Sequence, residues 1–230
     1  MYYLGIDWTY VLLVLPVMLL AFWAQANVTS TYSKYSKVKL TSHMTGEEAA
    51  RMILDRNGLY NVNIEHISGE LTDHFDPTAN VLRLSDNVYS SNTAAAVGVA
   101  AHEAGHAIQY ATQYAPMRLR AAIIPVSQLG SKLAIPLFLL GIFFSYPPLS
   151  YIGIVFFALA MLFQAITLPV EFDASNRALK ALEGSGRFTE EEISSSAKVL
   201  KAAALTYVAA LAVSLVQLLR LVILAGRRRR

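Results

Sequence analysis

The sequence contains no cysteine, and it is poor in charge for its length. Among its 230 residues 15% are Asp, Glu, Lys or Arg, and the formal net charge at neutral pH is only +3. Without cysteine there are no disulfides, no thiolate zinc sites and no cysteine nucleophile, so any bound metal must be held by His, Asp or Glu. Basic residues are scattered except for a run of four arginines at residues 227–230, so the sequence does not indicate nucleic acid as a partner.

Hydrophobic residues make up 55% of the chain, more than soluble proteins usually carry, and they gather in long runs. Residues 10–26 are uncharged and long enough for one bilayer crossing at about 1.5 Å per residue. Residues 123–168 hold two apolar runs joined by the sequence YPPLS, which predicts a helical hairpin in the membrane. Residues 204–226 are apolar again, apart from Gln217 and Arg220. We therefore expect a multi-pass protein of the plasma membrane, with the lipid bilayer as one partner.

The first apolar run has two interpretations. The sequence AQA at its end resembles a processing site, which would make the run a cleaved signal peptide. The first nine residues, however, carry Asp7 and no Lys or Arg, whereas signal peptides begin with a basic region. A retained membrane anchor is therefore the favoured interpretation.

Residues 27–122 predict a soluble, folded portion. Thr45 and Glu48 have the spacing of a helix capping box, and Gly58 is placed to end the same helix. A second capping box is indicated at Thr189 and Glu192. The stretches LYNVNIEHI, LTDHFD and VLRL are separated by turn sequences, and they predict a small β-sheet that precedes an alanine-rich helix.

The alanine-rich helix carries the sequence AAHEAGHAIQ, in which His102 and His106 are four residues apart and Glu103 lies between them. Positions four apart share one helix face, so the two imidazoles can bind one ion. Zinc held in this way lowers the pKa of a bound water to about 7, and an adjacent carboxylate can accept its proton during attack on a peptide carbonyl. The alternative is a pair of surface histidines beside a solvated glutamate. Gly105 costs the helix roughly 1 kcal/mol relative to Ala, which predicts close approach by another element.

A catalytic zinc needs a third protein ligand. Residues 169–203 follow the hairpin, and a hairpin returns the chain to the side that it left. Glu171, which we expect to open a polar helix in this region, is therefore the preferred third ligand. Asp173 is two positions further on and points away from Glu171 on a helix. The remaining histidines precede the motif and are less favoured ligands: His43, His66 and His74.

The three motifs AAHEAGHAIQ, VEFDASNRAL and ALTYVAA resemble, in order, those of the YugP-like family of bacterial membrane neutral zinc metallopeptidases. The resemblance covers nearly the whole chain. A wider similarity links it to HtpX-type and CAAX-processing membrane proteases, in which an H-E-x-x-H helix precedes a membrane hairpin and a ligand glutamate in E-F-x-A-D. The resemblance implies Glu103 as the base and three zinc ligands, His102, His106 and Glu171. The implied fold class is a mainly α, integral membrane helical protein with a zincin-like H-E-x-x-H catalytic portion and a small β-sheet.

The chain departs from the wider pattern at Ser175, where that pattern has aspartate. A carboxylate that supports a ligand histidine is therefore not carried over to this position, and Asp173 is a candidate substitute. Arg177 is either an oxyanion stabiliser or, as we favour, a salt-bridged or solvated side chain. Tyr207 either donates a hydrogen bond to the same oxyanion or, as we favour, is an aromatic residue at the membrane interface.

Basic residues near the ends of membrane segments mark the cytoplasmic side. They flank the catalytic portion and are absent from YPPLS, which predicts that the catalytic portion faces the cytoplasm. Residues 204–226 either cross the membrane or form a re-entrant segment that keeps the terminal arginines at the inner leaflet. The basic residues used in this assignment are Lys34, Lys37, Lys39, Arg118, Arg120, Lys198 and Lys201.

The function that the sequence predicts is a membrane-embedded zinc endopeptidase that acts on protein or peptide substrates, which an edge of the small sheet would bind as an added strand. The alternative is a zinc-binding, non-catalytic membrane adaptor that presents partners to other proteases. A transporter is disfavoured because the apolar runs contain few charges and no paired ionisable residues.

Overall fold

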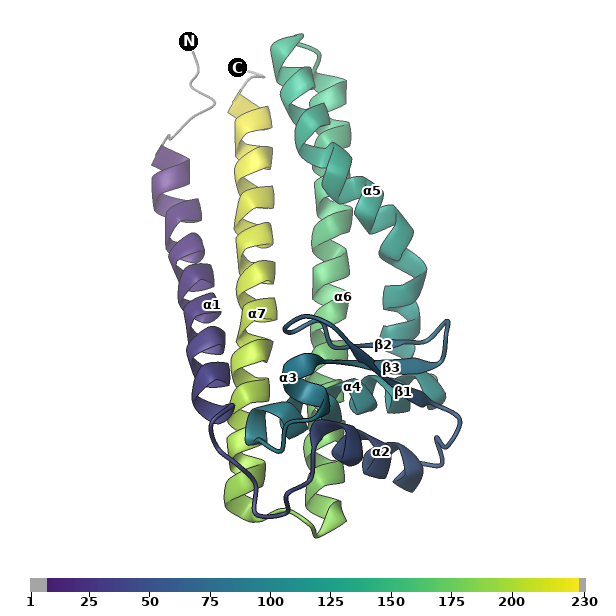
Figure 1. The fold of residues 1–230 in the computed structure, drawn as a ribbon. Coiled ribbons are helices and arrows are strands. Elements are labelled where there is room, and N and C mark those ends of the chain that lie inside the picture. The colour runs from purple at the N-terminus through teal and green to yellow at the C-terminus, as the bar shows by residue number, and fades with distance from the viewer. Residues whose placement is uncertain (1–7, 228–230) are drawn as a thin grey trace. The chain divides into compact units, whose positions relative to one another are not determined.

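A computed structural model describes residues 8–227, which divide into two compact units (Figure 1). Asp7 and the arginines at 228–230 lie outside the described residues. The helical unit comprises Met1–Gln25, Leu119–Leu168 and Thr206–Arg230, and the α/β unit comprises Ala26–Arg118 and Pro169–Leu205. Among the described residues, four helices continue without a break from one unit into the other. These are α1, Leu15–Tyr35; α5, Ala115–Phe143; α6, Pro147–Ser185; and α7, Glu190–Arg227.

Four helices of the described part of the chain are long and apolar enough to cross a membrane. They are α5, α6, α7 and the first helix, which begins as a π-helical turn over Tyr10–Val14 and continues as α1, Leu15–Tyr35. The predicted mainly helical membrane fold is therefore confirmed. The hairpin of α5 and α6 has a close backbone contact, because a Cβ on Gly130 would lie 2.8 Å from the carbonyl oxygen of Phe156. Small residues at such contacts are the usual means of packing helices in membranes.

The α/β unit is built around helix α4, Ala94–Ala111, in which fourteen of eighteen residues are buried. Alanine makes this possible, because it favours a helix and lets neighbouring elements approach closely. A three-stranded sheet and helix α2 pack against α4. The other elements of the unit are α2, Gly46–Arg56; β1, Asn63–Ile67; β2, His74–Asp76; β3, Val81–Ser85; and the short α3, Asp86–Tyr89.

The predicted small sheet is present, with the strand order β1-β3-β2. β1 and β3 are parallel, with Ile64 opposite Leu82, and β2 is antiparallel to β3, with Phe75 opposite Leu82. Both β1 and β2 are therefore edge strands within the described sheet. The first strand begins at Asn63, three residues after Tyr60, where the alternating pattern starts.

Both predicted capping boxes are confirmed. The Thr45 hydroxyl accepts from the Glu48 N–H at 3.2 Å, and the Glu48 carboxylate accepts from the Thr45 N–H at 2.8 Å. The corresponding distances between Thr189 and Glu192 are 3.2 and 2.8 Å. Thr93 is the N-cap of α4 and accepts from the Ala96 N–H.

The structure corrects several expected helix boundaries. The sequence predicted that Glu171 would open a new helix, but α6 is continuous from Pro147 to Ser185, and Glu171 lies inside it. Likewise, α1 ends at Tyr35 rather than near residue 26, and α5 begins at Ala115 rather than near residue 123. A change from apolar to polar composition does not end a helix, because each backbone hydrogen bond is made within the helix in either environment.

Candidate metal centre

His102 and His106 lie on one face of α4, as their spacing predicts. Their ring centroids are 4.7 Å apart and the rings are nearly perpendicular, at 78°. The side chain of His102 is 15% exposed and that of His106 is 11% exposed, so the pair sits at the edge of the buried core. Only a small part of each ring is therefore accessible to solvent and small solutes.

Glu171 approaches the same face from α6. Its Oε2 atom lies 3.2 Å from Nε2 of His102 and 3.6 Å from Nε2 of His106, and its side chain is only 4% exposed. One ligand atom from each of the three residues lies within 4.8 Å of the others. A buried carboxylate needs a positive partner, because desolvation of an unpaired charge is costly.

The donor set and its spacing fit zinc. Ligand atoms at Zn–N and Zn–O distances near 2.0–2.1 Å in a tetrahedron are about 3.3 Å apart, which is close to the two carboxylate–imidazole distances. Two imidazoles and one carboxylate are also a ligand set that zinc enzymes use, with a fourth position left for water or substrate.

Gln109 controls the orientation of the His106 ring. Its Nε2 donates to the carbonyl oxygen of Val170 and to the carboxylate of Asp173, both at 2.8 Å, so its Oε1 must face the histidine. Oε1 lies 3.0 Å from Nδ1 of His106. Because an amide oxygen only accepts, Nδ1 of His106 carries a proton, which leaves Nε2 as the ring nitrogen that can bind a metal. Sequence reasoning did not consider Gln109, although its position three residues after His106 places both on one helix face.

Ser175 supports the other histidine. Its hydroxyl oxygen lies 3.1 Å from Nδ1 of His102, and the hydroxyl can accept the ring proton there. Serine therefore occupies the supporting position at which the wider family pattern has aspartate. Asp173, the candidate substitute for that aspartate, is linked to His106 through Gln109 rather than to His102.

Arg177 belongs to the same network. Its Nε donates to the Asp173 carboxylate at 2.5 Å, and its guanidinium lies over the Tyr114 ring at 5.5 Å from the centroid. This pairing agrees with the favoured interpretation of Arg177 as a salt-bridged side chain. Tyr207 belongs to the helical unit and is 38% exposed.

Glu103 lies beside the histidines and is tied to the sheet. Its Oε2 accepts from the backbone N–H of Phe75 in edge strand β2 at 3.1 Å, and the residue is 9% exposed. The carboxylate is therefore held next to an edge strand. Catalytic carboxylates must be positioned in this way to accept a proton within hydrogen-bond reach.

The distance between α4 and α6 is set at Gly105. A Cβ at this position would lie 2.5 Å from the carbonyl oxygen of Ala174, closer than side-chain carbons approach a carbonyl. The predicted close approach by another element is therefore confirmed. Gly105 directly precedes His106 on α4, and Ala174 is three residues after Glu171 on α6, so the contact limits the separation of the helices that carry the candidate ligands.

The environment of His106 shifts its titration. Burial alone would lower the pKa of His106, but the hydrogen bond to Glu171 and the negative charges of Glu103 and Glu171 outweigh burial and raise the pKa above its ordinary value. The two carboxylates therefore favour a positive charge at the His106 ring. A bound cation would supply that charge in place of the proton.

The other histidines lie elsewhere. His66 is paired with Asp86 at 2.7 Å, and Nδ1 of His74 bonds to the carbonyl oxygen of Thr72 at 2.8 Å. His43 adopts a positive φ of 54° in the turn that precedes α2. Among the described residues, the group of metal-binding side chains that comes together consists of His102, His106 and Glu171.

The fold and this group define a class: a helical membrane protein whose H-E-x-x-H helix meets a glutamate from a later helix. The chain belongs to the family described as "Putative neutral zinc metallopeptidase", whose model matches residues 10–226. It is 47% identical over 215 residues to "Putative membrane protease YugP" of Bacillus subtilis (strain 168), which covers 94% of this chain and 96% of that protein. No solved structure matches the chain. The resemblance indicated by the three sequence motifs is thus confirmed.

Proposed function

We propose that this protein is a membrane-embedded, zinc-dependent endopeptidase in which His102, His106 and Glu171 hold the metal. The observation that carries the proposal is the spacing of the three ligand atoms, all within 4.8 Å of one another beside the Glu103 carboxylate. Membership of a zinc metallopeptidase family and similarity to a protein named as a membrane protease support the same function.

Zinc supplies an acidified water and a polarised substrate carbonyl when it is bound. Glu103 accepts the proton of the attacking water and then delivers it to the leaving amine, because its carboxylate is adjacent to the ligands and is fixed by the Phe75 N–H. Gln109 and Ser175 hydrogen-bond to the Nδ1 atoms and so direct both imidazole Nε2 atoms toward the site.

The edge of β2 is the proposed binding position for an extended substrate. β2 pairs with β3 on one side, and the N–H of Phe75 points to Glu103 on the other. A substrate that adds there as a strand gains backbone hydrogen bonds and brings a peptide bond beside the base.

For topology, we propose four crossings, with the α/β unit facing the cytoplasm. Lysines and arginines flank this unit, and α7 continues as one helix to Arg227, which supports a crossing by residues 204–226 rather than a re-entrant segment. The α5–α6 turn then lies on the outer side.

Glu103→Gln tests the function. Purified full-length protein should keep zinc but lose about 10²- to 10⁴-fold in hydrolysis of an unfolded protein, because the proton acceptor alone is removed. Metal analysis and the peptidase assay are performed on the same sample. Near-normal turnover would remove Glu103 from the role of base. Zinc binding by an intact protein that hydrolyses nothing would favour the non-catalytic adaptor.

A further inference from the structure

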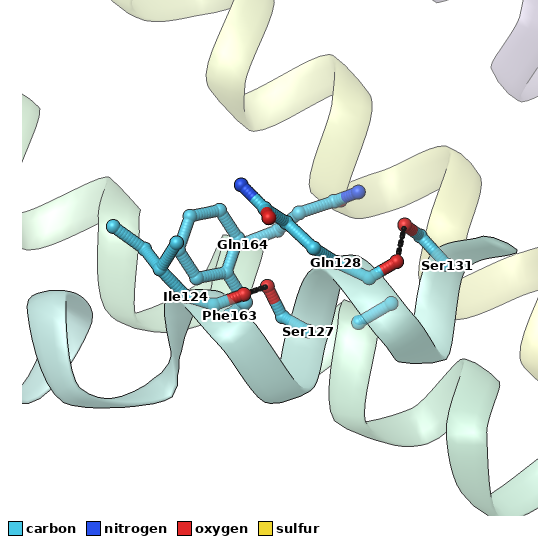
Figure 2. A pocket seen from close by; sticks show the side chains of 7 residues that line it. Ile124, Ser127, Gln128, Ser131, Phe163 and Gln164 are labelled. Atoms are coloured by element: carbon cyan, nitrogen blue, oxygen red, sulfur yellow. Dashed lines mark hydrogen bonds between the residues drawn. The ribbon is translucent and has the colours of Figure 1, made fainter.

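The helical unit contains a pocket of about 360 Å³ between α5 and α6 (Figure 2). Ile124, Ser127, Gln128 and Ser131 line it from α5, and Ala160, Phe163 and Gln164 line it from α6. The backbones of α5 and α6 are in close contact near this pocket, where Gly130 packs against Phe156. Within Leu119–Leu168, α5 leans away from α6 as the two helices leave their connecting turn (Figure 1).

The lining is uncharged, and it combines apolar side chains with two serines and two glutamines. The hydroxyls of Ser127 and Ser131 donate to carbonyl oxygens of their own helix, those of Ile124 and Gln128, at 3.1 and 3.0 Å (Figure 2). Oε1 of Gln164 accepts from Ser214 on α7 at 2.8 Å. These bonds satisfy the two serine hydroxyls and one oxygen of the glutamine amide.

Two primary amides keep unused hydrogen-bonding capacity. Within the described chain, the Gln128 amide and Nε2 of Gln164 have no hydrogen-bond partner, and Gln128 is exposed. In a bilayer such groups are costly unless a partner supplies the missing bonds. An uncharged lining selects against phosphate and carboxylate ligands, because nothing in it compensates their charge.

We propose that this pocket binds the backbone of a substrate's membrane-spanning segment where that segment is locally unwound. A primary amide offers one donor group and one acceptor, which complement the C=O and N–H of a peptide unit released from its own helix. Ile124 and Phe163 supply an apolar wall for the adjacent side chain. Regular helices satisfy their own backbone and gain little here, so the pocket selects interrupted ones.

The inference rests on the proposed proteolytic function, because it names membrane-spanning protein segments as the substrate class of that same enzyme. Gln164 precedes Glu171 by seven residues on α6. One helix thus carries both a pocket residue and a proposed zinc ligand.

Thiol cross-linking tests the pocket, and the chain has no native cysteine to interfere. Full-length Glu103→Gln protein with Ser131→Cys is placed in lipid nanodiscs. It is mixed with one of two single-span peptides that carry a mid-span cysteine, one interrupted by Gly-Pro and one uninterrupted. A bismaleimide reports contact. Leu129→Cys is the matched control, because Leu129 is 52% exposed on the same helix but does not line the pocket.

The expected result is selective cross-linking of the interrupted peptide at Ser131→Cys and not at Leu129→Cys. Adding Gln128→Leu should lower it about three- to ten-fold, the effect of losing one or two hydrogen bonds in a membrane. Because Gln128 contacts no protein partner through its amide, this change leaves the fold intact, which a thermal unfolding curve checks.

Equal cross-linking of both peptides, or cross-linking unaffected by Gln128→Leu, would overturn the inference. So would a co-purifying lipid that Gln128→Leu releases while the peptide signal stays unchanged. The assay needs no hydrolysis, so selective cross-linking together with an inactive wild-type enzyme would refute the proposed protease and leave the binding site standing.

Discussion

The carbonyl oxygen of Ala174 occupies the space that a side chain on Gly105 would need, so α4 and α6 meet backbone to backbone beside the candidate ligands. The contact connects the helix that carries both histidines with the helix that carries Glu171.

Gly105→Ala should destabilise the protein by about 1–3 kcal/mol, since overpacking outweighs the roughly 1 kcal/mol that alanine gains in a helix. Thermal unfolding in detergent is the measurement. Gly184→Ala is the matched control, because nothing lies within 4 Å of a Cβ there, and it should be neutral or stabilising. Equal effects at both positions would mean that the helix contact is not tight.

Glu171→Ala should reduce zinc affinity more than Asp173→Ala does. Glu171 lies within 3.6 Å of both imidazole Nε2 atoms, whereas Asp173 reaches His106 only through Gln109. Loss of a supporting residue costs about 10- to 100-fold in metal affinity, and loss of a ligand costs more. Competition titration with a zinc chelator gives both values, and the reverse order would make Asp173 the ligand.

Gln109→Leu should lower zinc affinity about 10- to 100-fold, because it removes the group that fixes the His106 tautomer. Nitrogen NMR of the histidine rings should show the change at His106 alone. Ser175→Ala is its counterpart and should alter the ring signals of His102. If either variant disturbs the opposite ring, the assignment of supporting residues is wrong.

Zinc should stabilise the protein more at about pH 8 than at about pH 6, because only neutral imidazole binds metal. The pKa of His106 is raised, so its proton stabilises the metal-free fold below the ordinary histidine pKa. That contribution is lost as the pH rises through the raised value. The Tm difference between zinc-loaded and chelator-treated protein measures the effect. A difference that stays constant across this range would contradict zinc binding by His106.

Single cysteines at Ser33 and Ser145, both exposed, should report the topology. A membrane-impermeant thiol reagent on intact cells should label Ser145→Cys, in the α5–α6 turn, and leave Ser33→Cys protected, because basic residues near Ser33 mark the inner side. The opposite pattern would place the α/β unit outside the cell.

Much of the architecture is predictable from local sequence. The capping residues Thr45 and Thr189 have fixed spacing to their glutamates, and the i,i+4 histidines must share a helix face, so each is determined within a few residues. Gly105 was informative because glycine inside a helix needs a reason. These features required no knowledge of distant contacts.

The remainder depends on long-range packing. The sequence could not show that β3 lies between β1 and β2, because this order depends on tertiary pairing. Nor could it show that Ser175 contacts His102, since 73 residues separate them. The expected break before Glu171 was wrong because Pro169 is accommodated within α6, where only one backbone bond is lost.

The ion pair of Asp173 with Arg177 has an electrical consequence. These two charges cancel, so the nearby groups that determine the charge of the centre are the carboxylates of Glu103 and Glu171, both nearly buried. With neutral imidazoles these two carboxylates give the centre two negative charges, and a divalent cation would bring the total to zero. The centre is thus electroneutral with a metal of charge two, and a singly charged ion would leave an uncompensated negative charge in a medium that screens it poorly.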